Sequence, residues 1–315
     1  MNKKLLAFIL FLSIGINIVL VCIYFSNERH FQKSLENEEL YKKYPYLSKR
    51  ILQEFPQDIL INFLDLRKEI RNEVAPYGNS FGIYFEYLPT GTSIGVNEKQ
   101  EFHAASLFKV PVIMAYYKQR ERMHMTNDPV LEIKEEHLDN EFGTLYQKGA
   151  GHKIKMSEAI RLSLEESDNT AAKMIASGVQ EADFNEVYNG VDIDLLADQN
   201  GAILTPKNYS SILKALYFSA VLEKESSSAI LNYLANSKFN DKLVAGIPPD
   251  ITVSHKIGDF IDKETGEKAY MDCGIVYLPR RPYLLCMVSE TNEDIARQRM
   301  SNLSRTIYNY ISKVE

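Results

Sequence analysis

Residues 251–290 read ITVSHKIGDFIDKETGEKAYMDCGIVYLPRRPYLLCMVSE and contain three segments rich in β-forming residues. These segments are Ile251–Ile257, Cys273–Leu278 and Tyr283–Val288. The last two flank the sequence Leu278-Pro279-Arg280-Arg281-Pro282, which is typical of a hairpin turn. The stretch therefore predicts that the C-terminal part of the chain supplies several strands of an antiparallel sheet.

The segments outside this stretch predict the rest of the fold. Ser80–Tyr87 and Ser93–Asn97 flank the turn sequence Pro89-Thr90-Gly91 and predict a second hairpin. Apolar residues at helical spacing predict helices elsewhere: Asp58–Val74, Ser106–Arg120, Ser157–Glu166, Thr170–Ser177, Lys207–Leu222 and Asp294–Ile311. This order predicts an α+β fold, in which an antiparallel sheet is formed from both ends of the domain and a helical subdomain is inserted between them.

The N-terminal segment predicts a membrane anchor. Leu5–Phe25 is a run of 21 residues without a charge, and a helix of that length spans a hydrocarbon core. The run is long for a cleaved signal peptide, and no Ala-x-Ala site follows it. We therefore expect an anchor at 1–25, a charged stalk at 26–56 and a catalytic domain at 57–315.

The charges flanking the run predict its orientation. Lys3-Lys4 precede the apolar segment, which places the N-terminus in the cytoplasm and everything after Phe25 outside the cell. The expected partner is the lipid bilayer, and the expected localisation is a single-pass protein of the cell membrane with an extracytoplasmic catalytic domain.

The composition is that of a globular protein, with 45% hydrophobic and 25% charged residues. A net charge of −6 argues against a nucleic-acid partner, because phosphates are bound by basic surfaces. The six histidines show neither an HExxH motif nor a Cys-x-x-Cys neighbour, so we expect no metal and no cofactor.

Three cysteines are present. Cys22 lies in the apolar N-terminal run, whereas Cys273 and Cys286 lie on the two strands of the predicted C-terminal hairpin. A disulfide between these two, offset diagonally across the strands, is possible. Two small buried hydrophobic side chains are the favoured interpretation.

The first motif with chemical meaning is Ser106-Leu107-Phe108-Lys109. On a helix, positions i and i+3 share a face, so the lysine amine can reach the serine hydroxyl. A serine becomes nucleophilic when a base takes its proton, and a lysine becomes such a base when burial or a nearby positive charge lowers its pKa. Taken alone the motif is weak, because Ser211-Ile212-Leu213-Lys214 has the same spacing in the middle of a predicted helix.

Two further motifs follow in the chain. Ser167-Asp168-Asn169 precedes a predicted helix, where Ser and Asp are also common N-cap residues. His255-Lys256-Ile257-Gly258 lies on a predicted strand, where a glycine permits close approach of a ligand to the backbone. Each motif alone has an ordinary structural explanation.

Together, in this order, the three motifs form the triple signature of penicillin-recognising serine enzymes. From about Ser80 onward the chain resembles the class A β-lactamase family. The Thr90-Gly91 hairpin, Phe102-His103-Ala104-Ala105 before Ser106 and Thr170-Ala171-Ala172 after the second motif are also similar to that family.

The resemblance implies a role for each motif residue. Ser106 matches the acylated nucleophile and Lys109 its basic partner. Ser167 matches the serine that passes a proton to the leaving nitrogen, Asn169 the residue that holds the substrate amide, and Lys256 the lysine that supports Ser167 and attracts a substrate carboxylate. The implied oxyanion hole consists of the backbone N–H groups of Ser106 and Asp259, with Gly258 beside them at the substrate-binding edge.

The sequence departs from the family pattern at two places. Residues 189–201, which correspond to the loop that carries the family's deacylating Glu, contain no Glu; Asp192, Asp194 and Asp198 are possible substitutes. Ile257 stands where the family has Thr or Ser, and it contributes no hydroxyl for a substrate carboxylate. Ile257 therefore either lines the substrate site or belongs to the core.

The leading hypothesis is a serine hydrolase that forms an acyl-enzyme at Ser106 on β-lactams or related cell-wall amides and esters, with slow deacylation. One alternative is a DD-peptidase-like penicillin-binding protein. A second, from another class, is a surface binding protein that retains the scaffold without catalysis; the presence of all five motif side chains argues against it.

Overall fold

The computed structural model describes residues 11–26, 28–29, 42, 62–194, 196–198, 201–262 and 265–313. Residues 11–26 are helical and exposed. Within the described part of the chain, no helix combines the length and the apolar character that crossing a bilayer requires. Residues 1–10 and nearly all of the predicted stalk lie outside the described residues. Residues from 60 onward form one compact unit.

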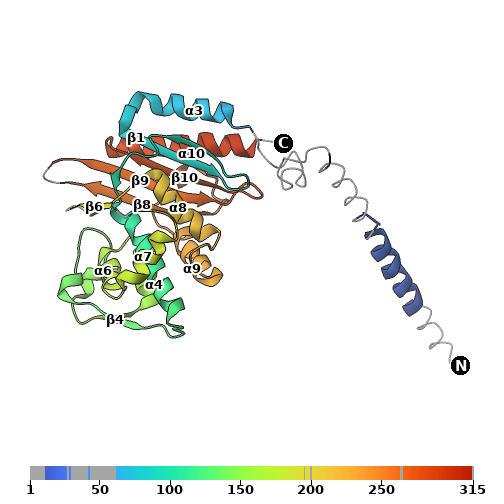
Figure 1. The fold of residues 1–315 in the computed structure, drawn as a ribbon, viewed down its shortest axis with the longest axis horizontal. Helices are drawn as coiled ribbons and strands as arrows, with labels where there is room; N and C mark the ends of the chain where they lie inside the picture. The colour runs from blue at the N-terminus through green and yellow to red at the C-terminus, as the bar shows by residue number, and fades with distance from the viewer. Residues whose placement is uncertain are drawn as a thin grey trace. The chain divides into compact units, whose positions relative to one another are not determined.

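A five-stranded antiparallel sheet organises this unit, with strand order β2-β1-β10-β9-β8 (Figure 1). The strands are β1 (Phe81–Tyr87), β2 (Thr92–Val96), β8 (Val253–Ile261), β9 (Lys268–Val276) and β10 (Tyr283–Ser289). Because β1 pairs with β10, the two ends of the domain meet in the middle of the sheet. The predicted α+β architecture is thereby confirmed, and β8 becomes an edge strand.

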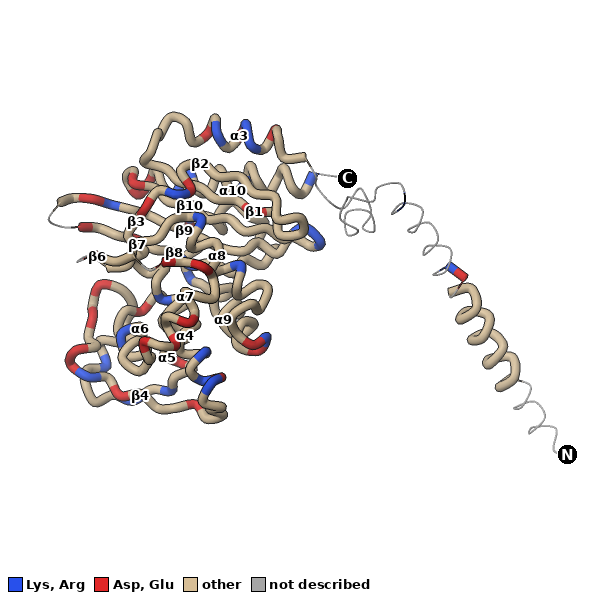
Figure 2. The backbone as a smooth tube through the Cα atoms, viewed as in Figure 1, with Lys and Arg blue, Asp and Glu red and all other residues tan. Residues whose placement is uncertain are grey.

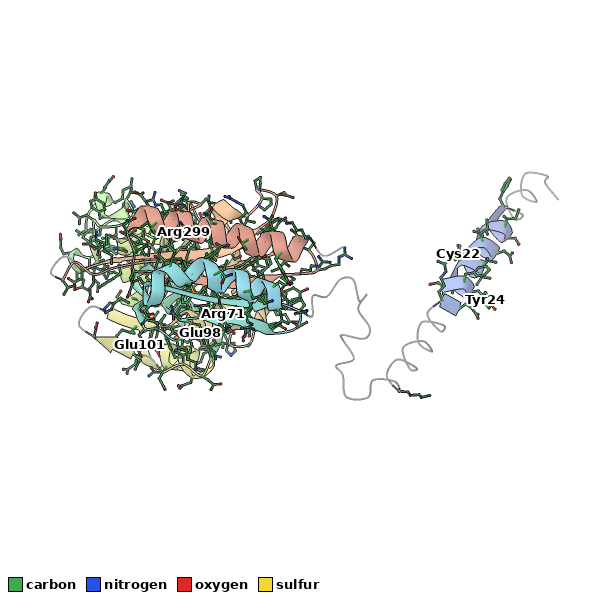
Figure 3. All side chains as sticks on the ribbon, turned by 90° about the horizontal axis from the view of Figure 1, so that it is seen from above. Cys22, Tyr24, Arg71, Glu98, Glu101 and Arg299 are labelled. Carbon is green, nitrogen blue, oxygen red and sulfur yellow. A yellow bond between two sulfur atoms is a disulfide. The ribbon has the colours of Figure 1, made fainter. Side chains whose placement is uncertain are left out.

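One face of the sheet is covered by α3 (Leu64–Val74) and α10 (Glu293–Ser312), which lie side by side (Figures 1 and 3). An aromatic cluster fills the space beneath them: the ring of Phe63 lies 5.8 Å from that of Phe85 and 6.3 Å from that of Tyr310 on α10. Alternation along a strand sends every second side chain to this face.

The opposite face packs against the helical subdomain in one continuous core. Its helices are α4 (Lys109–Arg122), α5 (Met156–Glu165), α6 (Asn169–Ala176), α7 (Glu181–Asn189), α8 (Pro206–Tyr217) and α9 (Lys224–Ala235). Two small sheets complete the described part, β3-β7-β6 and β4-β5. Their strands are β3 (Phe102–His103), β4 (Val130–Glu132), β5 (Lys153–Lys155), β6 (Leu196–Asp198) and β7 (Gly201–Leu204).

The helical half differs most from the sequence-based expectation. The predicted helix Lys207–Leu222 ends at Tyr217, because the chain turns at Ser219, whose φ of 52° is incompatible with a right-handed helix. Helices α7 and α9 were not predicted at all. Both are short, and each carries polar residues on its exposed side.

Cys273 and Cys286 form a disulfide, which corrects the favoured interpretation of two separate buried hydrophobes. The prediction of a diagonal offset was also wrong, since the register pairs Cys286 directly with Cys273. Directly opposed residues on antiparallel strands bring their Cβ atoms close enough for a covalent bond. The bond joins β9 to β10 on the face that packs against the helical core.

Acidic and basic side chains are interspersed along the domain (Figure 2). Several form surface ion pairs; for example, Lys68 on α3 contacts Asp65 on the same helix, and both side chains are exposed. Such exposed pairs contribute little to stability, about 0–1 kcal/mol each. The fold therefore depends on its two apolar cores rather than on surface charge.

Ile257 lies on the face of β8 opposite to Lys256. The register pairs Ile257 with Asp272 and Asp272 with Met287, which places Ile257 on the face covered by α3 and α10. Its side chain is 2% exposed. Of the two alternatives raised by the sequence, this position agrees with a core residue.

We therefore predict that Ile257→Thr lowers the free energy of unfolding by about 1–3 kcal/mol, because a hydroxyl replaces a buried methyl group. Ile261 on the same strand is 53% exposed, so Ile261→Thr serves as the matched control with a change within about 0.5 kcal/mol. Urea titration measures both. A variant Ile257→Thr of native stability that is acylated faster by penicillin G would show instead that the side chain borders the substrate.

Candidate active site

Ser106 lies in a short 3₁₀ helix that leads directly into α4. This helix, η2, spans Ala105–Phe108, and Lys109 is the first residue of α4. Ala105, immediately before Ser106, has a φ of 43°, a conformation that non-glycine residues rarely adopt and that recurs at functional sites. The amide of Ala104 donates to the carbonyl of Ala202 on β7 at 2.7 Å, which anchors the entry to this turn.

The side chain of Lys109 is buried and points to the second motif. Its Nζ lies 3.1 Å from Ser167 Oγ and 2.7 Å from Asn169 Oδ1, and it also donates to the carbonyl oxygen of Ser167. Burial lowers the pKa of Lys109 to about 7, although the negative charges of Asp168 and Asp139 oppose the shift. A lysine with this pKa is available as a base near neutral pH.

The turn Ser167-Asp168-Asn169 is held by its central residue. Asp168 is the N-cap of α6 and accepts a hydrogen bond from the amide of Ala171 at 2.8 Å. The same carboxylate accepts from the amides of Thr144 and Leu145, each at 2.8 Å. The N-cap explanation therefore applies to Asp168, while the side chains of Ser167 and Asn169 both contact Lys109.

This turn requires two unusual backbone positions. Ser167 has a φ of 55° and is fully buried. Gly143 has a φ of 87°, and a Cβ at that position would lie 2.0 Å from Asp168 Oδ2. A side chain at 143 would therefore displace the carboxylate that orders the turn.

Lys256 approaches Ser167 from the sheet. Its Nζ lies 2.8 Å from Ser167 Oγ, and the ring centroid of Phe239 lies 6.0 Å away. Complete burial, and then the charge of Lys109, lower the pKa of Lys256 well below its usual value. Two amines thus share one hydroxyl.

The edge strand β8 lies against the turn that carries Ser106. A Cβ on Gly258 would lie 3.1 Å from the carbonyl oxygen of Ala104 and 3.1 Å from Leu107 Cγ. The next residue, Asp259, makes an ion pair with the buried Lys242 at 2.9 Å. Sequence reasoning missed Lys242, since a single lysine in a loop carries no motif and no periodicity.

A second group that the sequence did not reveal is centred on Asp139. Its Oδ1 accepts from Asn169 Nδ2 at 3.0 Å, and its Oδ2 pairs with Lys173 Nζ at 2.8 Å. Burial raises the pKa of Asp139, but the hydrogen bonds from Lys173 and Asn169 prevail and hold it below its usual value. Asp139 therefore orients the amide of Asn169 as an ionised carboxylate.

The competing motif Ser211-Ile212-Leu213-Lys214 makes different contacts. Lys214 Nζ pairs with Glu86 at 3.1 Å, and Ser211 Oγ lies 3.5 Å from the carbonyl oxygen of Lys207 one turn earlier on α8. Because the amine of Lys214 is held as a charged partner of a carboxylate, this pair lacks a free base.

The loop acids considered as substitutes for the missing Glu are exposed. Asp192 and Asp194 follow α7, and Asp198 lies on β6, 3.7 Å from His103 Nδ1. Their role as a deacylating base remains a prediction.

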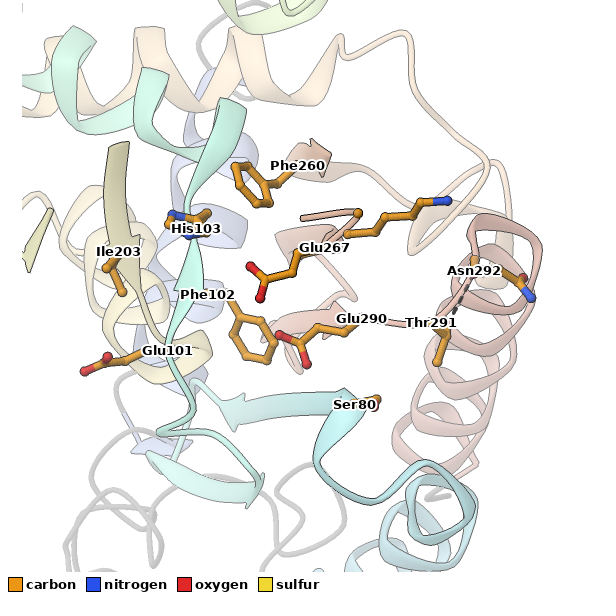
Figure 4. Close-up of a pocket in the computed structure, with 13 residues that line it drawn as sticks. Ser80, Glu101, Phe102, His103, Ile203, Phe260, Glu267, Glu290, Thr291 and Asn292 are labelled. Carbon is orange, nitrogen blue, oxygen red and sulfur yellow. Dashed lines mark hydrogen bonds between the residues drawn. The ribbon is translucent and has the colours of Figure 1, made fainter. Parts of the chain in front are cut away.

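A cavity of about 710 Å³ lies near the end of β8 that carries Phe260 (Figure 4). Three carboxylates border it, from Glu101, Glu267 and Glu290, and the pKa of Glu290 is raised by burial and then by Glu267. His103 and Phe260 stack beside it with ring centroids 4.3 Å apart. None of the motif side chains lines this cavity, so its size does not make it the reaction centre. Among the described residues, no group of His, Cys, Asp and Glu is arranged to hold a metal.

The geometry brings Lys109, Ser167 and Lys256 together, with Asn169 held between Lys109 and Asp139. Ser106 lies one helical turn before Lys109 in the chain. Such a cluster can transfer protons between neighbouring groups.

Comparison with known proteins agrees with this geometry. The chain is 22% identical over 247 residues to a β-lactamase of Phocaeicola vulgatus, covering 70% of this chain and 76% of that protein. It is 23% identical over 218 residues to β-lactamase CARB-3 of Pseudomonas aeruginosa, covering 65% of this chain and 72% of that protein.

Solved structures share the fold at low identity. PBP-A superposes with a TM-score of 0.71 at 24% identity over 79% of this chain and 97% of its own. TLA-3 extended-spectrum β-lactamase superposes with a TM-score of 0.73 at 19% identity, over 80% of this chain and 100% of its own. The family model described as the beta-lactamase enzyme family matches residues 65–311. The chain belongs to the beta-lactamase enzyme family and is a serine hydrolase of that family.

Proposed function

We propose that the protein forms an acyl-enzyme at Ser106 with β-lactams or related cell-wall amides and esters, and releases the acyl group slowly. The observation that carries this proposal is that Lys109, one helical turn after Ser106, and Lys256 both direct their Nζ atoms at Ser167 Oγ, at 3.1 and 2.8 Å.

In the proposed first step, Ser106 Oγ attacks the carbonyl carbon and Lys109 takes the serine proton. Ser167 lies between the two amines. It donates its proton to the leaving nitrogen or oxygen as the C–N or C–O bond breaks, and takes up in its place the proton that Lys109 accepted from Ser106. A neutral amine at pH 7 is required for the first transfer, and the lowered pKa of Lys109 supplies it.

The developing oxyanion is assigned to the backbone N–H groups of Ser106 and Asp259. Two features support this assignment: β8 is an edge strand, and the residue before Asp259 lies against the turn that bears Ser106. Donors fixed before the reaction contribute strongly to rate enhancement. The ion pair between Lys242 and Asp259 holds the second donor in place.

Substrate recognition is assigned to Asn169 and Lys256. Asn169 is oriented by Asp139 to present its amide to the amide of a substrate. The relatives named as β-lactamases support a β-lactam as one substrate class, and a variant of PBP-A has been captured as an acyl-enzyme with penicillin G.

The proposed slow release of the acyl group rests on the carboxylate beside Asn169 in the part of the chain that the structure describes. Water attack on an acyl-enzyme needs a positioned base. Asp139 is the carboxylate that contacts Asn169, but both of its oxygens are engaged. This favours a protein that retains penicillin, and the DD-peptidase-like alternative shares that property.

A binding protein without catalysis is the weaker alternative. Burying two lysine side chains is costly unless the amines are neutral or paired. Lys109 and Lys256 are 8% and 0% exposed, an arrangement that a purely adhesive surface does not need.

We also propose that residues 1–25 anchor the protein in the cell membrane with the catalytic domain outside. The support is the uncharged run Leu5–Phe25 behind Lys3-Lys4. Fractionation should recover the full-length protein with membranes, and protease added to intact cells should digest the domain. Recovery of an N-terminally trimmed protein in the medium would favour a cleaved signal peptide.

The pH dependence of acylation tests the role of Lys109. Because the deprotonated amine is the base and its pKa is about 7, the rate of labelling by a fluorophosphonate should rise through pH 7 and level off above it. Lys109→Ala should slow labelling by several orders of magnitude. Whole-protein mass spectrometry measures the adduct.

The matched pair of controls comes from the two serine–lysine motifs. Ser106→Ala should abolish labelling, and Ser211→Ala should leave both the extent and the pH profile unchanged. Labelling that survives in Ser106→Ala, or disappears in Ser211→Ala, would move the site to α8.

The lifetime of the penicillin adduct tests slow deacylation. After brief exposure to penicillin G and removal of the excess, the mass of the adduct should persist for minutes or longer. Rapid steady-state hydrolysis of nitrocefin would contradict this. Asn substitutions at Asp139, Asp192, Asp194 and Asp198 would then identify the base.

A further inference from the structure

A second cavity opens directly beside the proposed reaction centre. It has a volume of about 300 Å³, at the lower end of the range for ligand pockets, roughly 300–1,000 Å³. Lys109 and Asn169 line it, together with Ala105, the neighbour of Ser106. The cavity therefore shares walls with the site at which an acyl group would be attached.

The walls of this cavity are chiefly apolar. Phe108, Val112 and Ile113 come from η2 and α4, and Ala172 and Ile175 come from the facing side of α6. An uncharged aliphatic group is the ligand chemistry that gains free energy on entering such a space.

The charges of the cavity cancel each other. Asp139 and Lys173 both line it, and they pair at 2.8 Å. The third ionisable group, Lys109, has a pKa lowered to about 7 by burial. A charged ligand would therefore find no unpaired charge of opposite sign in the cavity. An uncharged ligand needs none.

One polar atom in the wall has an unused hydrogen bond. Ser163, on α5, is 0% exposed and lines the cavity. Its Oγ has no hydrogen-bond partner among the described residues. A buried hydroxyl left unpaired is unfavourable, so a ligand atom that bonds to it restores the lost interaction.

We propose that this cavity is the subsite for the acyl part of the substrate, and that it selects an uncharged acyl chain with an apolar stem and one hydrogen-bonding group that reaches Ser163. The proposal rests on acyl-enzyme formation at Ser106. With an ester, Ser106 Oγ bonds to the carbonyl carbon and the bond to the alkoxy oxygen breaks. The serine proton leaves with the alcohol, and the chain remains on Ser106 until water releases it as a carboxylic acid.

The test uses the full chain and p-nitrophenyl esters. The kcat/KM for octanoate should exceed that for acetate by about tenfold or more, because each buried methylene favours binding. In a series of octanoate esters with a ketone at successive positions, at least one should exceed octanoate by about threefold to tenfold, from a single hydrogen bond.

Variants test the contribution of the apolar wall and that of the Ser163 hydroxyl separately. Val112→Phe on α4 and Ala172→Leu on α6 fill the cavity from opposite sides, and either should lower the octanoate-to-acetate ratio about tenfold. Ser163→Ala should keep that ratio and abolish the gain from the ketone. Melting temperatures show which variants are folded. If one of the two filling variants fails to fold, the other still tests the cavity.

Each outcome is decisive. An octanoate-to-acetate ratio near one, or a ratio that a folded filling variant leaves unchanged, overturns the subsite. A ketone gain that is missing in the wild type or persists in Ser163→Ala overturns the role of Ser163. Absence of any Ser106 adduct with fluorophosphonate and penicillin G is a separate failure, that of the acyl-enzyme proposal itself.

Discussion

Two buried amines sharing one serine hydroxyl are the constraint to which the rest of the site conforms. Lys109 and Lys256 lose most of their hydration, and burial lowers the pKa of each amine; for Lys256 the charge of Lys109 adds to the shift. The arrangement is tolerable only if the acceptor between them is fixed. Asp168 fixes it, by accepting three backbone N–H bonds that hold the turn in a conformation rare for serine.

The sheet and the helical subdomain each provide one of the two lysines. Lys109 begins α4, whereas Lys256 lies on β8, the edge strand formed near the end of the chain. Gly258 permits the edge of β8 to lie against η2, because a side chain there would press on the carbonyl of Ala104. The proposed reaction centre is therefore formed at the contact between two layers, and neither layer contains it alone.

The sequence was most informative where local pattern and chemistry coincide. The three motifs, the strands β1, β2 and β10 and the closing helix could be predicted from alternation, turns and caps, whereas β9 begins at Lys268, five residues before the predicted segment. Lys242 and Asp139 could not, because their partners lie far away in the chain and no spacing rule connects them. The disulfide was misjudged for a related reason: hairpin register depends on the turn, and a shift of one residue changes which side chains meet.

Dependence on long-range packing also makes the cavity beside the proposed site harder to predict than the motif residues. Serine, lysine and asparagine at fixed spacing carry a signal of their own. The cavity beside them is formed by ordinary alanine, valine and isoleucine residues whose spacing indicates only a helix core. Its shape emerges from how α4, α5 and α6 pack, and the same residues in another packing would leave no space.

The pairing of β1 with β10 has a consequence for how the protein is made. Phe81 pairs with Ser289, so the centre of the sheet joins segments from opposite ends of the domain. Contacts of such sequence separation form slowly, and a growing chain lacks them until its last strands appear. The helical half, with Lys109, is synthesised before β8 delivers Lys256. During that interval the turn that bears Ser167 lacks its contact with Lys256, so the proposed site is complete only when the final strands close the sheet.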